Sequence, residues 1–476
     1  MRSPSSSTPA AIALAALMLL VVPTRAHDGA KFEPADGRVL HGAGQSPAAF
    51  DNYTQALGDP ALTPFVTKAY FPVWDRWPKL WHEGNATFDE LVTNHYEPFE
   101  AWLAAQHGRM PEVSMGFPLY DGTYGDRIIL SGDLDPVIEF AALQIKAFGE
   151  PVFVRPGFEP RVGQYTPGET YITAYRRVVD IFRALEVDNA AFVWCAGPVN
   201  GVLMAVEDLW FPGDTYVDWV GLDLFSEQHF LPNAQHQALG LPYPPGVVAM
   251  LELANSWRKP VILSEVSAVF PGGISDPSPA AADAYWDLWF EPFFQLIRDN
   301  PRIKAFCYID WDWPAEGWPF WADARIENNP HLAARYAQEM ADPRYLHRGA
   351  TEKFPAPWIT SLGRQGTAGD IVTIRVENAA PHAPILWSHG EALLVQPGNT
   401  GYVDYDLGEP AGNGFWHLAD PYEEVGVVFA DANGRFELWF VIPNWPELPG
   451  TTQIFQTAVT GPDGERLTRA YELAID

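Results

Sequence analysis

The sequence predicts a (β/α)8 barrel followed by an all-β sandwich module, and three observations carry that prediction. Short apolar runs alternate with longer helical patterns from about Arg38 to Arg344, and eight such runs occur. The helical periodicity then ends between about residues 346 and 358. Beyond that point strand-like segments follow, separated by Gly, Pro, Asn and Asp turns. An open doubly wound sheet is the alternative, but the glycine-rich phosphate turn that it needs after an early strand is missing.

The eight apolar runs are strand candidates because each is short, mostly apolar and bounded by turn residues. Helix-period segments lie between them, and the clearest are residues 170–185 and 281–298. Strands and helices therefore alternate as a barrel requires. In chain order the strand candidates are Val39–Gly42, Phe65–Tyr70, Glu112–Phe117, Pro151–Arg155, Ala191–Trp194, Tyr216–Asp223, Pro260–Glu265 and Ile303–Ile309.

The N-terminal residues 1–26 have the pattern of a secretory signal peptide. Arg2 precedes an apolar run, and the small residues Thr24 and Ala26 flank Arg25 at a cleavage site before His27. The barrel domain is expected over 27–345, a linker over 346–357 and the β-sandwich accessory domain over 358–476. No later apolar run is long enough to cross a bilayer. We therefore expect a secreted or periplasmic protein without a membrane span.

The amino-acid composition limits the classes of molecule that the protein is expected to bind. The 476 residues include 60 acidic against 30 basic side chains, a formal net charge of -30. Such a charge disfavours nucleic acids and polyanionic substrates, which require clustered Lys and Arg. The 19 Trp residues are the least ordinary feature, because exposed aromatic rings usually serve a ligand. We expect a neutral oligosaccharide or polysaccharide as the partner, and a monomer.

Two glutamates follow buried strand candidates. Glu159 comes after the fourth run and Glu265 ends the seventh. Chemistry in barrels of this type lies at the carboxyl ends of the strands. Strand alternation places Glu159 on the face of Arg155, and it places Glu265 on the face of Leu263 and Val261. With both faces pointing inward, both carboxylates are predicted to rise into the barrel mouth. Facing carboxylates about 5–5.5 Å apart are what retaining glycoside hydrolysis requires, one with a raised pKa and one ionised.

At these residues the sequence resembles clan A of the retaining glycoside hydrolases, and within it family 26, which includes β-mannanases. The resemblance rests on residues 153–159, 171–177, 191–194, 210–223 and 259–265, and it spans roughly residues 38–345. It implies that Glu159 is the acid/base and Glu265 the nucleophile. Two positions differ from the family pattern. Phe158 stands where the family usually has His, and Phe225 follows the sixth strand where a Tyr usually donates to the nucleophile.

Further side chains near strand ends are candidates for sugar binding. Indole rings stack on the apolar face of a pyranose, and polar groups bind its hydroxyls. The candidates are Trp74, Tyr120, Arg155, Trp194, Asp223, His229, Trp311 and Trp313. Arg155 could equally hold a carboxylate ionised. No metal or cofactor is expected, since no known ligand motif occurs. Cys195 and Cys307 are expected to be buried free thiols.

The sequence thus predicts an exported retaining endo-glycosidase that acts on a neutral β-linked polysaccharide of the β-mannan or β-glucan type. Two alternatives stay open. One is a non-catalytic glycan-binding protein built on the barrel, and the other is a transglycosylase that remodels exported polysaccharide.

Overall fold

The computed structural model describes residues 30–350 apart from 73–96, 118, 121–122, 161–164, 167, 198–209 and 239; beyond residue 350 it describes strands alone. The predicted signal peptide (1–26) and Trp74 lie outside the described residues. Of the predicted linker (346–357) only residues 346–350 are described, and Leu346 belongs to β11 (Tyr345–Leu346), which pairs with the first barrel strand. No helix in the described part of the chain has the length and apolar character needed to cross a membrane.

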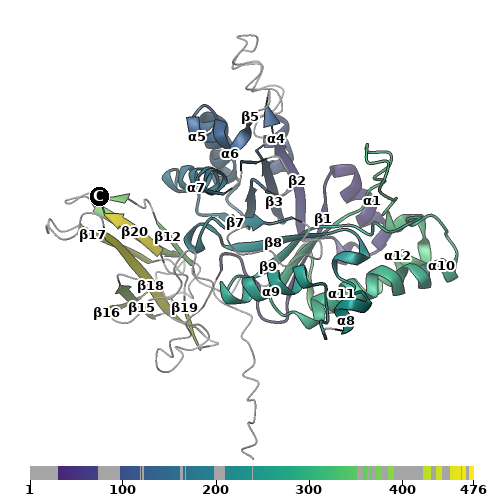
Figure 1. Cartoon of the computed structure of the whole chain (residues 1–476). Helices are drawn as coiled ribbons and strands as arrows, with labels where there is room; N and C mark the ends of the chain where they lie inside the picture. Colours follow the sequence, from purple (N-terminus) through teal and green to yellow (C-terminus); the bar gives the residue numbers. More distant parts are fainter. Residues whose placement is uncertain are drawn as a thin grey trace, which may run out of the picture.

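Eight parallel strands close into a barrel surrounded by helices (Figure 1). The ring is completed by pairing of the first strand with the last, where Leu40 lies opposite Ala305 and Gly44 opposite Ile309. This confirms the predicted barrel, and each of the eight predicted runs overlaps one strand. In chain order the strands are β1 (Val39–Gly44), β2 (Val66–Pro72), β3 (Met110–Gly116), β6 (Val152–Pro156), β7 (Ala190–Cys195), β8 (Trp219–Leu224), β9 (Val261–Val266) and β10 (Ile303–Ile309).

The main helices follow the strands as predicted. The segment 170–185 is α7 (Glu169–Ala184). The segment 281–298 is divided instead into α10 (Pro279–Tyr285), a π-helical turn η6 (Trp286–Phe290) and α11 (Glu291–Asp299). Pro292 lacks the N–H that would continue an α-helical ladder, which accounts for the interruption. The other α-helices are α1 (Pro47–Leu57), α4 (Glu97–Ala104), α5 (Gly125–Ser131), α6 (Asp135–Phe148), α8 (Ala234–Ala238), α9 (Pro245–Ser256) and α12 (Pro330–Met340).

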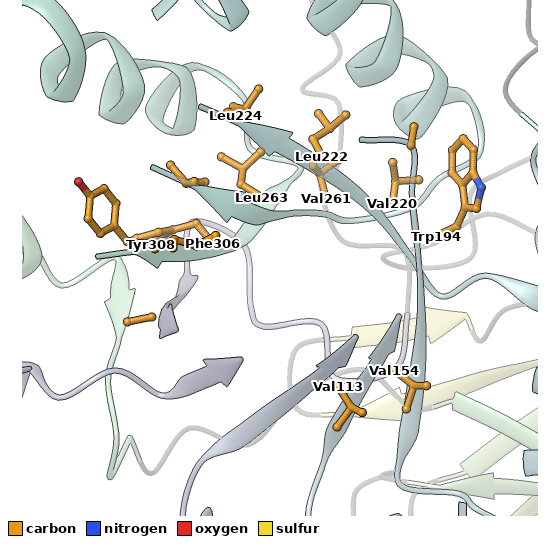
Figure 2. Packing of buried hydrophobic residues seen from close by; sticks show 14 of the residues in the cluster. Val113, Val154, Trp194, Val220, Leu222, Leu224, Val261, Leu263, Phe306 and Tyr308 are labelled. Carbon is orange, nitrogen blue, oxygen red and sulfur yellow. The ribbon is translucent and has the colours of Figure 1, made fainter. Parts of the chain in front are cut away.

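Strand alternation separates two packed layers. Residues that face outward fill the space between strands and helices, as the labelled Val113, Leu222 and Phe306 do in Figure 2. Residues that face inward form a smaller apolar cluster, which includes Leu40, Phe153, Trp219, Ile262 and Ala305. The inward positions nearer the carboxyl ends of the strands are polar or charged instead. They are Lys68, Glu112, Ser114, Arg155, Asp223 and Glu265, all buried.

The C-terminal region contains strands, as predicted. They form a three-stranded sheet, β12 (Trp358–Ser361), β14 (Ile371–Glu377) and β17 (Phe436–Val441). A six-stranded sheet contains β13 (Gln365–Gly366), β15 (Pro384–Gly390), β16 (Tyr422–Phe429), β18 (Thr451–Gly461), β19 (Gly464–Leu467) and β20 (Tyr471–Ile475). The side chains of these strands lie outside the described residues, so the sandwich packing and the domain boundaries stay predictions.

Candidate active site

Glu265 lies within β9, as predicted, but the prediction that it shares a face with Leu263 and Val261 is wrong, because those two residues point outward. A β-bulge turns Glu265 into the barrel and sets its neighbour. Leu222 of β8 lies opposite Leu263, but the next residue, Asp223, lies opposite Glu265. One extra residue, Ser264, is therefore accommodated on β9. The bulge brings Asp223 and Glu265 side by side at the carboxyl ends of two neighbouring strands.

Three donors converge on one oxygen of Glu265. Arg155 Nη1 lies 2.5 Å, Tyr70 Oη 2.8 Å and Lys68 Nζ 3.0 Å from Oε1. Among the described residues no donor is found for Oε2. The carboxylate is thus held by one oxygen while the other stays available for chemistry.

Glu159 reaches the mouth through a turn rather than by strand alternation. Strand β6 ends at Pro156, and both Gly157 (φ 53°) and Glu159 (φ 51°) adopt the left-handed conformation. A Cβ on Gly157 would lie 2.5 Å from the ring of Phe117, so this turn requires glycine. The Glu159 N–H donates to the carbonyl of Cys195 at 3.0 Å. Glu159 lies in the barrel mouth, as predicted. The turn at residues 157–159 places it there, and the predicted strand alternation does not, because the strand ends at Pro156.

A third carboxylate, Asp223, completes the cluster. One oxygen from each of Glu159, Asp223 and Glu265 lies within 4.8 Å of the other two. Asp223 is fully buried and accepts from Arg155 Nη2 at 2.7 Å and from Cys195 Sγ at 3.2 Å. Because Arg155 also binds Glu265, a single guanidinium joins two of the three carboxylates.

The environment separates the protonation states of the two glutamates. Burial, the charge of Asp223 and the charge of Glu265 together raise the pKa of Glu159 to about 9. Burial also acts to raise the pKa of Glu265, but Lys68 and Arg155 outweigh it and hold that pKa at about 2. At neutral pH Glu159 is therefore protonated, and it donates a hydrogen bond to Asp223, while Glu265 is ionised.

The three carboxylates have the spacing of a cation site. Their negative charge is already met by buried cations, since Arg155 pairs with Asp223 and Glu265, and Lys68 pairs with Glu265. The donor set is accordingly an ion-pair network built from the protein's own side chains.

Several predicted sugar-binding residues lie elsewhere. Arg155 is fully buried with its guanidinium on carboxylates, so it orients them and is not a sugar contact. Asp223 is likewise buried and takes the same positioning role. Trp194 is fully buried on the outward face of β7 (Figure 2). Its ring packs edge-on against Phe211 and Trp257. The prediction that Trp194 stacks on a sugar is wrong, because the strand alternation at this position points it at the helices.

The remaining candidates lie near the mouth or outside the described side chains. Trp313 is 4% exposed and donates to Ser267 Oγ, two residues beyond Glu265, while Trp311 is half-buried against it. His229 is half-buried and its Nδ1 accepts from the N–H of Phe225. The side chain of Tyr120, in β4 (Leu119–Tyr120), lies outside the described residues.

Sequence reasoning missed two of the three donors to Glu265. Lys68 and Tyr70 both come from β2, which is not a neighbour of β9 in the barrel. The signal was present, because Lys68 and Tyr70 share the inward face of a buried strand with Val66. A lysine at an inward strand position has to meet a carboxylate, and that requirement points to a charged barrel interior. Cys195 and Cys307 are buried free thiols, as predicted.

The fold and the site together define a class of protein: a (β/α)8 barrel with a protonated glutamate after its fourth strand and an ionised glutamate near the end of its seventh strand. The model of the family described as Glycosyl hydrolase family 26 matches residues 129–289, a range that contains Glu159, Asp223 and Glu265. This match, with the relatives described below, confirms the resemblance to a divergent family 26 glycoside hydrolase that the sequence indicated.

The relatives that this chain resembles share low sequence identity with it. A β-1,3-xylanase, TXYA, of Vibrio sp. is 25% identical over 364 residues, which cover 70% of this chain and 71% of that protein. A β-1,3-xylanase of Alcaligenes sp. is 25% identical over 232 residues, 43% of this chain and 46% of that protein. Among solved structures, a modular endo-β-1,4-mannanase of Cellulomonas fimi is 17% identical with a TM-score of 0.46, covering 95% of this chain and 99% of that one.

Proposed function

We propose that this protein is an exported, retaining glycoside hydrolase that cleaves a β-linked polysaccharide internally. The observation that carries the proposal is the pairing of a protonated Glu159 with an ionised Glu265 in one barrel mouth. Their oxygens lie within 4.8 Å, which fits the close spacing of retaining enzymes rather than the wider gap of about 6.5–9.5 Å in inverting ones.

The geometry supports a double displacement. Glu265 Oε2 attacks the anomeric carbon, the bond to the leaving oxygen breaks, and that oxygen takes the proton of Glu159. Water then attacks the same carbon, Glu159 accepts its proton, and the bond to Glu265 breaks. Glu265 carries no charge while it is esterified, so one of the causes that raise the pKa of Glu159 is then absent. Glu159 can therefore act as an acid in the first step and as a base in the second.

The substrate belongs to the neutral β-linked polysaccharides. The protein's acidic charge supports a neutral glycan. The two relatives described above are named β-1,3-xylanases, so β-1,3-xylan joins the β-mannan and β-glucan expected from the sequence. Export is supported by the signal-peptide pattern of residues 1–26.

The test is hydrolysis of β-1,3-xylan, β-1,4-xylan, β-mannan, β-1,3-glucan and mixed-linkage glucan, read as reducing ends and as a fall in viscosity. Glu265→Ala should abolish turnover, and azide should rescue it as a glycosyl azide of inverted configuration. Proton NMR of the first product should show the anomeric configuration of the substrate. Binding without product across the panel would instead identify a glycan-binding protein, and normal activity in Glu265→Ala would refute the mechanism.

A further inference from the structure

The hydroxyl of Tyr70 lies between two acceptors. It is 2.8 Å from Glu265 Oε1 and 2.8 Å from Gln45 Oε1. A phenol has a single proton, and the ionised carboxylate is the stronger acceptor. The proton of Tyr70 therefore goes to Glu265, and the side-chain amide of Gln45 turns its NH₂ toward the phenol oxygen, since amide O and N are assigned from their partners. The result is a directional chain from Gln45 through Tyr70 to Glu265.

The ring of Tyr70 is held by its neighbours. The Phe158 ring packs against it with centroids 5.4 Å apart, and the Lys68 ammonium lies 5.4 Å from the Tyr70 centroid. The same Phe158 ring lies 4.5 Å from the guanidinium carbon of Arg155. Phe158 thus contacts two of the three donors to Glu265 and restricts the orientations that each can adopt.

The aromatic side chain that follows β8 has no hydroxyl. Phe225 follows that strand directly, and its ring packs against Trp321, Trp313 and His229 at centroid distances of 4.7, 5.9 and 6.5 Å. The Phe225 ring supplies packing and no hydrogen bond. Tyr70, from the opposite side of the mouth, is the phenol that contacts Glu265 in the described part of the chain.

We infer that Tyr70 is the positioning residue of the nucleophile: its hydroxyl, fixed by Gln45 and Phe158, holds Glu265 Oε1 so that Oε2 faces the sugar. This inference rests on the proposed function. Partial burial and the ionised Glu265 raise the pKa of Tyr70 well above its ordinary value, so the phenol stays a donor throughout the working pH range. Because Tyr70 is 37% exposed, its ring borders the space that a sugar would enter.

Tyr70→Phe removes one hydroxyl and keeps the ring that Phe158 packs against. The loss of a hydrogen bond to a charged group should lower kcat roughly 10- to 100-fold with little change in KM. The acid limb of kcat/KM should move upward by about one pH unit, because Glu265 loses a donor that favours its ionised form. Tyr243→Phe is the matched control: it removes a phenol that donates to Asp299 at 2.7 Å, away from the mouth.

The titration of Glu265, followed by ¹³C-carboxyl NMR in wild type, Tyr70→Phe and Tyr243→Phe, needs no substrate. Glu265→Gln assigns the signal. A higher midpoint in Tyr70→Phe alone, with the fall in kcat, supports the inference. If wild type hydrolyses a glycan of the panel and Tyr70→Phe matches Tyr243→Phe in kcat and in the midpoint, the inference is overturned while the proposed function stands. An inactive wild type would refute the function, and the NMR titration would still decide whether Tyr70 holds Glu265.

Discussion

Asp223→Asn tests how the protein keeps a proton on Glu159. Asp223 is the second-largest cause of the raised pKa of Glu159, after burial. At 4.8 Å, the upper limit of their separation, and an effective dielectric constant near 20, two unit charges interact by about 3.5 kcal/mol, which corresponds to about 2.5 pH units. The asparagine removes the charge but keeps the shape and an oxygen that can accept the hydrogen bond from Glu159. Part of the upward shift in the pKa of Glu159 therefore remains. The pKa of Glu159 should fall by about 1–2 units from about 9.

The assay is the pH dependence of kcat/KM, whose alkaline limb reports the acid in the free enzyme. Without the Asp223 charge, Glu159 loses its proton at lower pH, so the alkaline limb should move toward neutral pH. Asp135→Asn is the matched control, because Asp135 also pairs with an arginine, Arg177, but on the outer helices. An unchanged or more alkaline limb in Asp223→Asn would refute the electrostatic account of Glu159.

Three further predictions concern the stability of the fold and the role of Trp194. Gly157→Ala should lower the free energy of unfolding in urea by about 2–4 kcal/mol, since it adds a Cβ at positive φ beside Phe117. An unchanged free energy of unfolding would contradict the requirement for glycine in this turn. Trp194→Phe should lower stability by about 1–3 kcal/mol and leave KM unchanged, because the ring is core and not a sugar platform; a several-fold rise in KM would restore the original prediction. His41 Nδ1 lies 2.9 Å from His347 Nδ1, and burial lowers the pKa of both, so stability should fall as pH drops below about 6.5. Urea midpoints from pH 8 to 5 should show this fall weakened in His347→Gln, and an equal fall in both proteins would argue against it.

The alternation of short apolar runs with helical segments predicted much of the barrel, because both patterns are local properties of the sequence. Buried parallel strands are short apolar runs, and eight of them fix the architecture before any contact is known. Residue alternation along the strand did not predict the orientation of Glu265, because it places Glu265 on the outward face of Leu263, and the bulge at Ser264 is what turns Glu265 inward. Trp194 shows where the rule was applied incompletely, since the alternation that turns Cys195 inward must turn Trp194 outward. The predicted helix over 281–298 is confirmed as helical throughout, and only its π-helical turn, which Pro292 explains, was not predicted.

The roles of the carboxylates depend on contacts between distant parts of the chain. Glu265 is held by Lys68 and Tyr70 from β2 and by Arg155 from β6, and its alignment with Asp223 depends on a bulge that no periodicity reveals. Among the described residues no ion pair with Glu159 is found, while Asp223 and Glu265 both bind Arg155. The carboxyl groups therefore differ in charge because Arg155 pairs with Asp223 and Glu265 but not with Glu159. Glu159 keeps its proton as a result. That distribution assigns the acid and the nucleophile, and it can be derived only after the barrel has brought four strands together.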